Sequence, residues 1–66
     1  MTIKLNGEPF ALPRSITVAD LLAQLQIDSR RVAVELNLVV LKRATFATTV
    51  VSDGDEVEIV NFVGGG

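Results

Sequence analysis

Hydrophobic and polar residues alternate at the start of the chain, and this period of two predicts a half-buried β-strand over residues 2–6. The dipeptide Asn6-Gly7 then predicts a tight hairpin turn, because both residue types tolerate a positive φ. We expect the return strand over residues 9–12. Pro9 places that strand at an edge of a sheet or at a strand start, since proline has no amide proton to donate, and Pro13 ends it.

A helical period follows the two strands. Thr17 is a good N-cap, and Asp20 lies three residues further on, where a carboxylate favours the positive end of a helix. The predicted helix runs over residues 18–26, and residues 28–29 are expected to break it. Its apolar stripe repeats at helical spacing and consists of Val18, Leu21, Leu22 and Leu25.

The second half of the chain predicts three more strands. Residues 32–36 alternate, Asn37 marks a turn, and residues 38–41 form a short apolar run. Residues 43–49 show no clear period and carry no assignment. The sequence Asp53-Gly54-Asp55 predicts a turn, after which residues 56–63 read as the last strand.

This order of elements predicts one α+β domain over residues 1–63, followed by a glycine tail over residues 64–66. We expect a mixed sheet, rolled around one main helix that packs on one face. The first and last strands are predicted to lie side by side and parallel at the centre of the sheet. The predicted core joins the inward positions of the strands to the helix stripe: Ile3, Leu5, Leu21, Leu22, Leu25, Val32, Val34, Val57 and Ile59.

The composition narrows the chemistry. The 66 residues include no Cys, His, Tyr or Trp, which excludes a thiolate nucleophile, an imidazole base and the usual zinc and iron–sulfur sites. We therefore expect a protein that is not an enzyme and binds no cofactor. The net charge of −2 argues against nucleic acid as a partner. No apolar run could span a bilayer and no secretory signal is evident, so we expect a cytoplasmic protein without a membrane partner.

The triplet Gly64-Gly65-Gly66 directly follows the last apolar run. Without a Cβ atom such a tail is thin and can enter a narrow cleft, and three extended residues span roughly 10 Å. We expect the tail to deliver its terminal carboxylate to the active site of another protein. Because an ionised carboxylate is a poor electrophile, it would need activation, for which adenylation by ATP is the obvious route. The alternative is a disordered end without a function.

The last strand also carries apolar residues on both faces. If Val57 and Ile59 face the core, Val60 and Phe62 lie on the solvent face beside the tail. We expect Val60, Phe62 and the adjoining Val63 to bind a partner protein, because exposed apolar residues next to a functional terminus favour docking. The alternative is that the strand twists and buries Phe62.

Acidic residues gather around the preceding turn, at Asp53, Asp55, Glu56 and Glu58. Paired carboxylates can hold a cation or perform acid–base catalysis. The interpretation as a solvated turn is favoured here, because no other catalytic residue type accompanies them.

Four segments together resemble one known family. They are Asn6-Gly7-Glu8, the TVADLL run at residues 17–22, the VAVELN run at residues 32–37, and the DGDEVEIV run at residues 53–60 with the terminal glycines after it. In this order they are similar to the ThiS family of sulfur carrier proteins of thiamine biosynthesis, over nearly the whole chain. The resemblance implies the β-grasp, ubiquitin-like fold.

The resemblance also implies a function. Gly66 would be adenylated by an E1-like adenylyltransferase of the ThiF type with ATP, with Gly65 as the penultimate glycine. A cysteine-desulfurase persulfide would then convert it to a thiocarboxylate, which supplies sulfur to a thiazole synthase of the ThiG type. The chain departs from the family at Lys42-Arg43, where a Pro-Arg pair is common, and at Phe46, where a Trp is common.

Two alternatives stay open. The small subunit of molybdopterin synthase shares the fold and the tail, although its chains are usually longer. A β-grasp module that binds partners non-covalently, with an inert tail, is the other.

Overall fold

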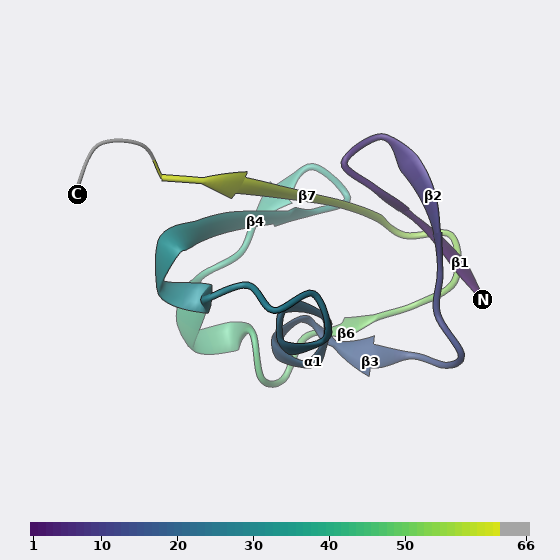
Figure 1. Cartoon of the computed structure of the whole chain (residues 1–66), viewed down its shortest axis with the longest axis horizontal. Helices are drawn as coiled ribbons and strands as arrows, with labels where there is room; N and C mark the ends of the chain where they lie inside the picture. Colours follow the sequence, from purple (N-terminus) through teal and green to yellow (C-terminus); the bar gives the residue numbers. More distant parts are fainter. Residues whose placement is uncertain (63–66) are drawn as a thin grey trace.

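The computed structural model describes residues 1–62 of the chain (Figure 1). Five strands form the main sheet in the order β2-β1-β7-β4-β5, and a two-stranded sheet pairs β3 with β6. The elements in chain order are β1 (Thr2–Leu5), β2 (Glu8–Ala11), β3 (Ile16–Thr17), α1 (Val18–Gln24), η1 (Ser29–Arg31), β4 (Val32–Leu36), β5 (Val39–Val40), η2 (Arg43–Thr45), β6 (Val50–Val51) and β7 (Glu56–Asn61), where η marks a 3-10 helix.

The main sheet has the predicted arrangement. β1 pairs with β7 in parallel at the sheet centre, with Leu5 opposite Val57, and β7 pairs with β4 in the antiparallel sense. Asn6 and Gly7 form the predicted hairpin turn, with φ values of 49° and 84°. Pro9 lies in the edge strand β2, as expected. These findings confirm the α+β class with a mixed sheet.

The helix begins as predicted and ends earlier. The Thr17 hydroxyl accepts from the Asp20 amide at 3.0 Å, and the Asp20 carboxylate accepts from the Thr17 amide at 3.4 Å, which makes a capping box. The prediction that the helix reaches residue 26 is wrong, because Gln26 takes a left-handed conformation with φ 59°. The Ile27 amide then bonds back to the Leu22 carbonyl at 2.9 Å, as in a Schellman motif.

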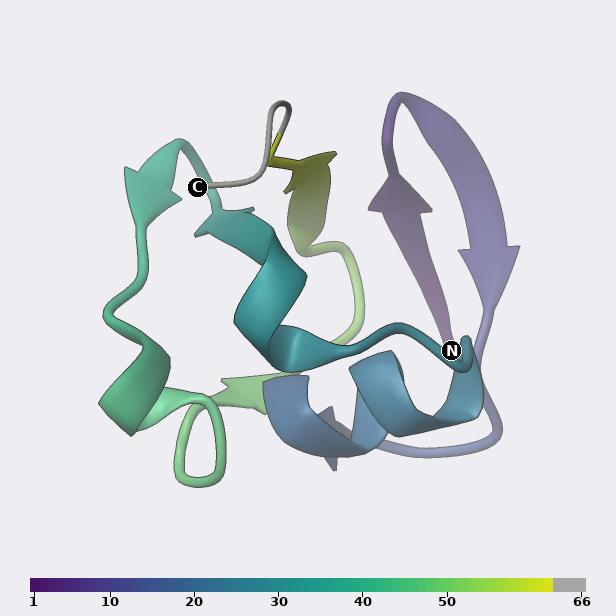
Figure 2. The same ribbon diagram turned by 60° about the vertical axis from the view of Figure 1, so that its left-hand side comes forward.

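The small sheet of β3 and β6 was not predicted. It lies with α1 on the same side of the main sheet in both Figure 1 and Figure 2. The unassigned residues 43–49 include η2 and supply carbonyls to the start of α1, since the Ala19 amide donates to Phe46 and the Val18 amide donates to Thr49, both at 2.9 Å. Two-residue strands have no measurable period, which explains why the pattern missed them.

The core lies between the main sheet and α1. Six of the nine predicted core residues are buried, and Leu5, Leu25 and Ile59 pack around them half-buried. Leu12, Phe46 and Val51 are buried although they stand outside the predicted core. The predicted bounds of four strands also shift: β1 ends at Leu5 rather than at residue 6, β2 covers Glu8–Ala11 rather than residues 9–12, β5 covers Val39–Val40 rather than residues 38–41, and β7 ends at Asn61. Val63 and the glycines lie outside the described residues.

Candidate functional site

The end of β7 exposes two large apolar side chains. Val60 is 53% exposed and Phe62 is 58% exposed, whereas Val57, of the opposite parity, is 1% exposed. The predicted exposure of this face is therefore confirmed, and the alternative that a twist buries Phe62 is wrong. Val60 lies opposite Ala33 of β4 in the sheet register, so these two residues share the face that points away from α1. Exposed apolar area of this kind marks a candidate docking surface.

Two asparagine side chains hold β7 in place from opposite sides. The Asn6 Oδ1 atom accepts from the Ile59 amide at 2.7 Å, on the side of β1. The Asn37 Oδ1 atom accepts from the Glu56 amide at 2.9 Å, on the side of β4. The sequence pattern identified both only as turn residues. The signal that could have revealed this role is the residue type, because an asparagine side chain can replace a backbone partner.

Beyond Ile59, β7 runs past the end of β1. Its pairing with β4 continues to Asn61 opposite Val32, and the Phe62 amide donates to the Arg31 carbonyl at 2.9 Å. Within the described chain, residues 60–62 therefore form backbone bonds only on the side of β4. Figure 1 shows β7 extending away from the β1–β2 hairpin toward the C-terminus. The last residues of β7 therefore lie beyond the end of β1 and, among the described strands, beside β4 alone.

Basic residues lie beside this end of β7. Arg30 and Arg31 form most of η1, and the Asp28 carboxylate caps η1 by accepting from the Arg30 amide at 2.9 Å. Arg30 also donates from Nε at 3.1 Å and from Nη2 at 3.0 Å to the two Asp28 oxygens. The side-chain hydrogen bond from Arg30, the largest cause, lowers the pKa of Asp28 from 3.8 to about 2.

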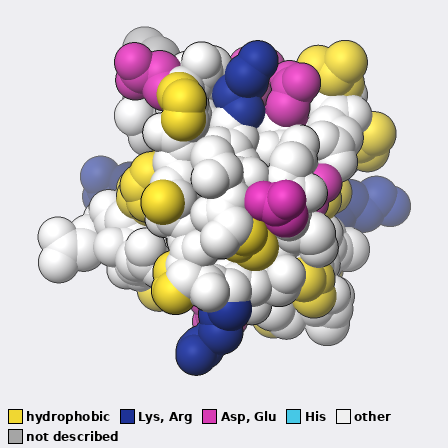
Figure 3. Space-filling view, turned by 90° about the vertical axis from the view of Figure 1, so that its right-hand side faces the viewer, with side chains coloured by type: hydrophobic (Ala, Val, Ile, Leu, Met, Phe, Trp, Pro, Cys, Tyr) yellow, Lys and Arg dark blue, Asp and Glu magenta, His cyan; other side chains and the backbone are white. Residues whose placement is uncertain are grey.

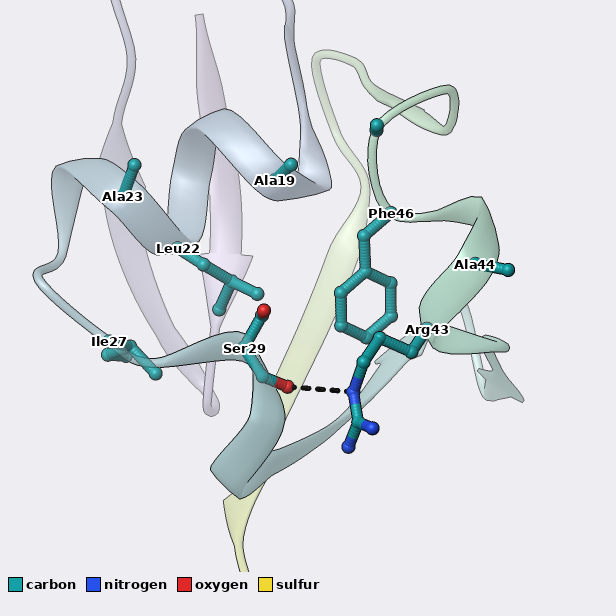
Figure 4. A pocket seen from close by; sticks show the side chains of 9 residues that line it. Ala19, Leu22, Ala23, Ile27, Ser29, Arg43, Ala44 and Phe46 are labelled. Carbon is teal, nitrogen blue, oxygen red and sulfur yellow. Dashed lines mark hydrogen bonds between the residues drawn. The ribbon is translucent and has the colours of Figure 1, made fainter.

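Arg43 ties η2 to η1. Its Nε donates to the Ser29 carbonyl at 3.2 Å, which Figure 4 shows, and its Nη2 donates to the Arg30 carbonyl at 3.2 Å. Arg43 occupies the arginine position of the Pro-Arg pair that the resemblance led us to expect. Lys42 in place of the proline is therefore compatible with the hydrogen bonds from Arg43 to the carbonyls of Ser29 and Arg30. Phe46, in place of the Trp, is buried at 4% exposure.

A hollow of about 350 Å³ lies beside Arg43, between α1 and η2 (Figure 4). Its lining is mostly apolar and includes Ala19, Leu22, Ile27 and Phe46. Among the described residues that line it, Arg43 has the only charged side chain and none has a carboxylate. The hollow therefore offers no pair of groups for acid–base chemistry.

The acidic turn before β7 has a structural role. The Asp53 carboxylate accepts from the Thr2 amide at 2.8 Å, and the Asp55 carboxylate accepts from the Ser52 amide at 2.8 Å. Glu56 and Glu58 are exposed on the outer face of β7. Among residues 1–62, no group of three or more potential ligands could hold a metal ion. These contacts support the interpretation as a solvated turn.

The predicted glycine tail is not among the described residues. Gly64, Gly65 and Gly66, together with the predicted partner-binding residue Val63, lie outside the described residues. The structure therefore brings Val60 and Phe62 together at the start of the tail and leaves the role of the tail as a prediction. No helix of the described chain is long and apolar enough to cross a membrane.

A mixed sheet with parallel central strands and one helix across one face defines the class of small β-grasp domains. The thiamine biosynthesis protein ThiS from Geobacter metallireducens has this structure. It matches with a TM-score of 0.89 and 42% identity over 100% of both chains. The model of the ThiS family matches residues 3–66, and the chain belongs to the ThiS family.

Two relatives extend the comparison. The sulfur carrier protein ThiS of Bacillus subtilis is 35% identical over 97% of this chain and 98% of its own length. A thiazole synthase of Paramagnetospirillum magneticum is 47% identical over 100% of this chain. The chain spans only 20% of the length of that thiazole synthase.

Proposed function

We propose that this protein is a sulfur carrier of thiamine biosynthesis and that Gly66 is the residue that carries the sulfur. The observation that supports this most strongly is the match of the ThiS family model, which runs through Gly66 itself. A chain of nearly the same length in Bacillus subtilis is a sulfur carrier protein. The proposal favours thiamine biosynthesis over the molybdopterin pathway, because the matching family is ThiS.

The proposed chemistry begins at the terminal carboxylate. A carboxylate oxygen of Gly66 attacks the α-phosphorus of ATP and releases pyrophosphate, which leaves an acyl adenylate. The terminal sulfur of a cysteine persulfide then attacks the acyl carbon and displaces AMP. This gives an acyl disulfide, and a thiol reductant supplies the two electrons that split its S–S bond and leave the thiocarboxylate.

We propose that partner enzymes perform every catalytic step, because this chain contains neither Cys nor His. An E1-like adenylyltransferase of the ThiF type would hold ATP, and a cysteine desulfurase would supply the persulfide. A thiazole synthase of the ThiG type would accept the sulfur. The thiazole synthase relative supports this last partner, since one segment of that polypeptide matches this whole chain. The cytoplasmic location stays a prediction.

The exposed pair Val60 and Phe62 would set how the tail enters a partner. An aromatic anchor that is buried on binding fixes the orientation of the strand end, and misplacing a reacting group by about 1 Å can cost two orders of magnitude in rate. Val57 and the two asparagine contacts hold β7 rigidly behind this pair. The fold would therefore fix the position and direction from which the tail enters the partner.

The test is adenylation of the chain by the ThiF-type enzyme of the same organism. Adenylation is measured as the exchange of labelled pyrophosphate into ATP. We expect exchange with the wild-type chain and none after deletion of Gly66, because the deletion shortens the reach by about 3.5 Å. The melting temperature of the truncated chain should equal that of the wild type. Normal exchange by the truncated chain would refute the role of Gly66, and no exchange by either chain would favour an inert tail.

A further inference from the structure

The charges of this chain are divided between its two ends. Four of the six basic residues lie in or next to η1 and η2, and we call these four the cationic collar: Arg30, Arg31, Lys42 and Arg43. The Asp28 carboxylate forms ion pairs with Arg30 and Arg31. Its single negative charge leaves the collar with three uncompensated positive charges. The other two basic residues and seven acidic residues give the remainder of the chain five net negative charges.

The collar lies on the β4 side of the point where the described chain ends. The Arg31 carbonyl accepts from the Phe62 amide, so Arg31 lies beside the last described residue. Arg43 bonds to the carbonyls of Ser29 and Arg30 and so belongs to the same cluster. Lys42 lies near β4, because the amide of the preceding residue, Leu41, donates to the carbonyl of Val34 in β4 at 2.9 Å.

The opposite end of the molecule has a different surface. Figure 3 shows this end with acidic side chains at the surface and basic side chains among them. The turn before β7 carries Asp53 and Asp55, and Glu56 begins the strand at the end remote from Phe62. The collar therefore concentrates positive charge at the end of the molecule that the tail follows, and seven of the eight acidic residues lie outside the collar.

The collar cations are available to a partner. In residues 1–62, the ion pairs are those of Asp28 with Arg30 and Arg31. The Arg31 side chain is 84% exposed and its Nε lies 3.8 Å from Asp28, a distance too long for a good hydrogen bond. Lys42 is exposed as well. Clustered exposed charges of one sign create a local potential that attracts a surface of the opposite sign.

We propose that the cationic collar docks against Asp and Glu side chains that rim the cleft of the activating enzyme, the cleft that receives Gly66. This inference rests on the proposed function. Complementary charge accelerates association and selects the orientation of approach more than it raises affinity. A chain with a cationic end and an acidic end would turn tail-first toward a negatively charged cleft. The apolar pair Val60 and Phe62 would then be buried once the collar has aligned the molecule.

The test compares charge reversals at the two ends of the molecule. Arg31→Glu and Lys42→Glu alter the collar, and Arg14→Glu is the matched control. Arg14 is an exposed residue of the loop between β2 and β3, which lies away from the chain end in Figure 1. The measurement is pyrophosphate exchange with the ThiF-type enzyme, at low and at high salt. Melting temperatures establish that each variant is folded, and Arg31→Gln provides a milder change at the same position.

We expect each collar reversal to lower kcat/KM about tenfold at low salt, through KM for the carrier, since electrostatic steering changes association rates by 10-fold or more. The loss should shrink at high salt, where charges are screened within a few ångströms. Arg14→Glu should stay within about twofold of the wild type, because its charge lies far from the contact.

Equal KM values for the collar variants and Arg14→Glu would overturn the proposal. An increase in KM for ATP alone would also overturn it, because the collar would then serve the nucleotide rather than the partner surface. Exchange by the wild-type chain and its loss on deletion of Gly66 test the proposed function separately. Failure of the collar variants to differ from the control would then refute the collar alone.

Discussion

Phe46 and Phe62 have the same side chain and opposite environments. Phe46 is 4% exposed and packs beneath α1, in a segment whose hydrophobic pattern has no clear period. Phe62 is 58% exposed at the end of a strand whose alternation is clear. A domain of 66 residues has few large side chains with which to build a core, and this one has only three Phe and no Trp or Tyr. Phe62 therefore adds little to the core, and its exposure supports the docking role that we propose for it.

The two faces of β7 show the same division within one strand. Val57 lies in the core, with its strand between β1 and β4, whereas Val60 and Phe62 lie on the outer face where pairing continues only with β4. The buried half is anchored by Asn6 and Asn37. The inward positions of this strand contribute to stability and the outward ones are those for which we propose partner binding, so the two can be perturbed separately.

The largest expected effect is on stability, from Phe46→Ala. Removing a buried aromatic side chain leaves a cavity and should lower the free energy of unfolding by about 3–5 kcal/mol. Denaturant unfolding measures this directly. Leu22→Ala, at a buried position of α1, should cost about 2–5 kcal/mol and serves as a second core variant. If both variants unfold like the wild type, the assigned core is wrong.

The matched substitution Phe62→Ala should leave stability within about 0.5 kcal/mol of the wild type, as expected for a surface site. It should weaken binding to the activating enzyme by about 1–3 kcal/mol if Phe62 is an anchor of the interface. Calorimetric titration of the enzyme with each variant gives the affinity. Unchanged affinity would remove Phe62 from the interface and leave its exposure unexplained.

The smallest expected effect concerns Asp28 at the base of the collar. Its pKa is lowered to about 2, so its contribution to stability is complete above its ordinary pKa of 3.8 and is lost as the pH falls through about 2. An NMR titration of the carboxyl carbons should show this low midpoint. Arg30→Gln should raise the midpoint toward 3.8, because the side-chain hydrogen bond from Arg30 is the largest cause. A midpoint that does not move would contradict that cause.

Much of the fold was predictable because its main strands and its helix have clear periods. The alternation over residues 2–6 and 32–36, the N-cap at Thr17 and the parallel central pair are all confirmed. The exposure of Val60 and Phe62 followed from parity alone, since one residue of difference places a side chain on the other face.

Other features depend on contacts between distant segments. β3 and β6 have two residues each. Phe46 belongs to a segment that folds back on α1, where the Phe46 carbonyl accepts from the Ala19 amide. The left-handed conformation of Gln26 is chosen by the Schellman bonds, not by residue type. The collar joins residues 30–31 and 42–43 through one arginine, and neither pair predicts the other along the chain.

The central claim is that Gly66 carries sulfur, and the intact mass of the protein isolated from its own cells during thiamine synthesis tests it most directly. The account predicts a population heavier by the difference between one sulfur and one oxygen atom, with fragmentation placing that difference on Gly66. Alkylation by a thiol-directed reagent should label this population, because the chain contains no Cys. A protein found only at its unmodified mass, in cells whose activating enzyme and desulfurase are both active, would contradict the account.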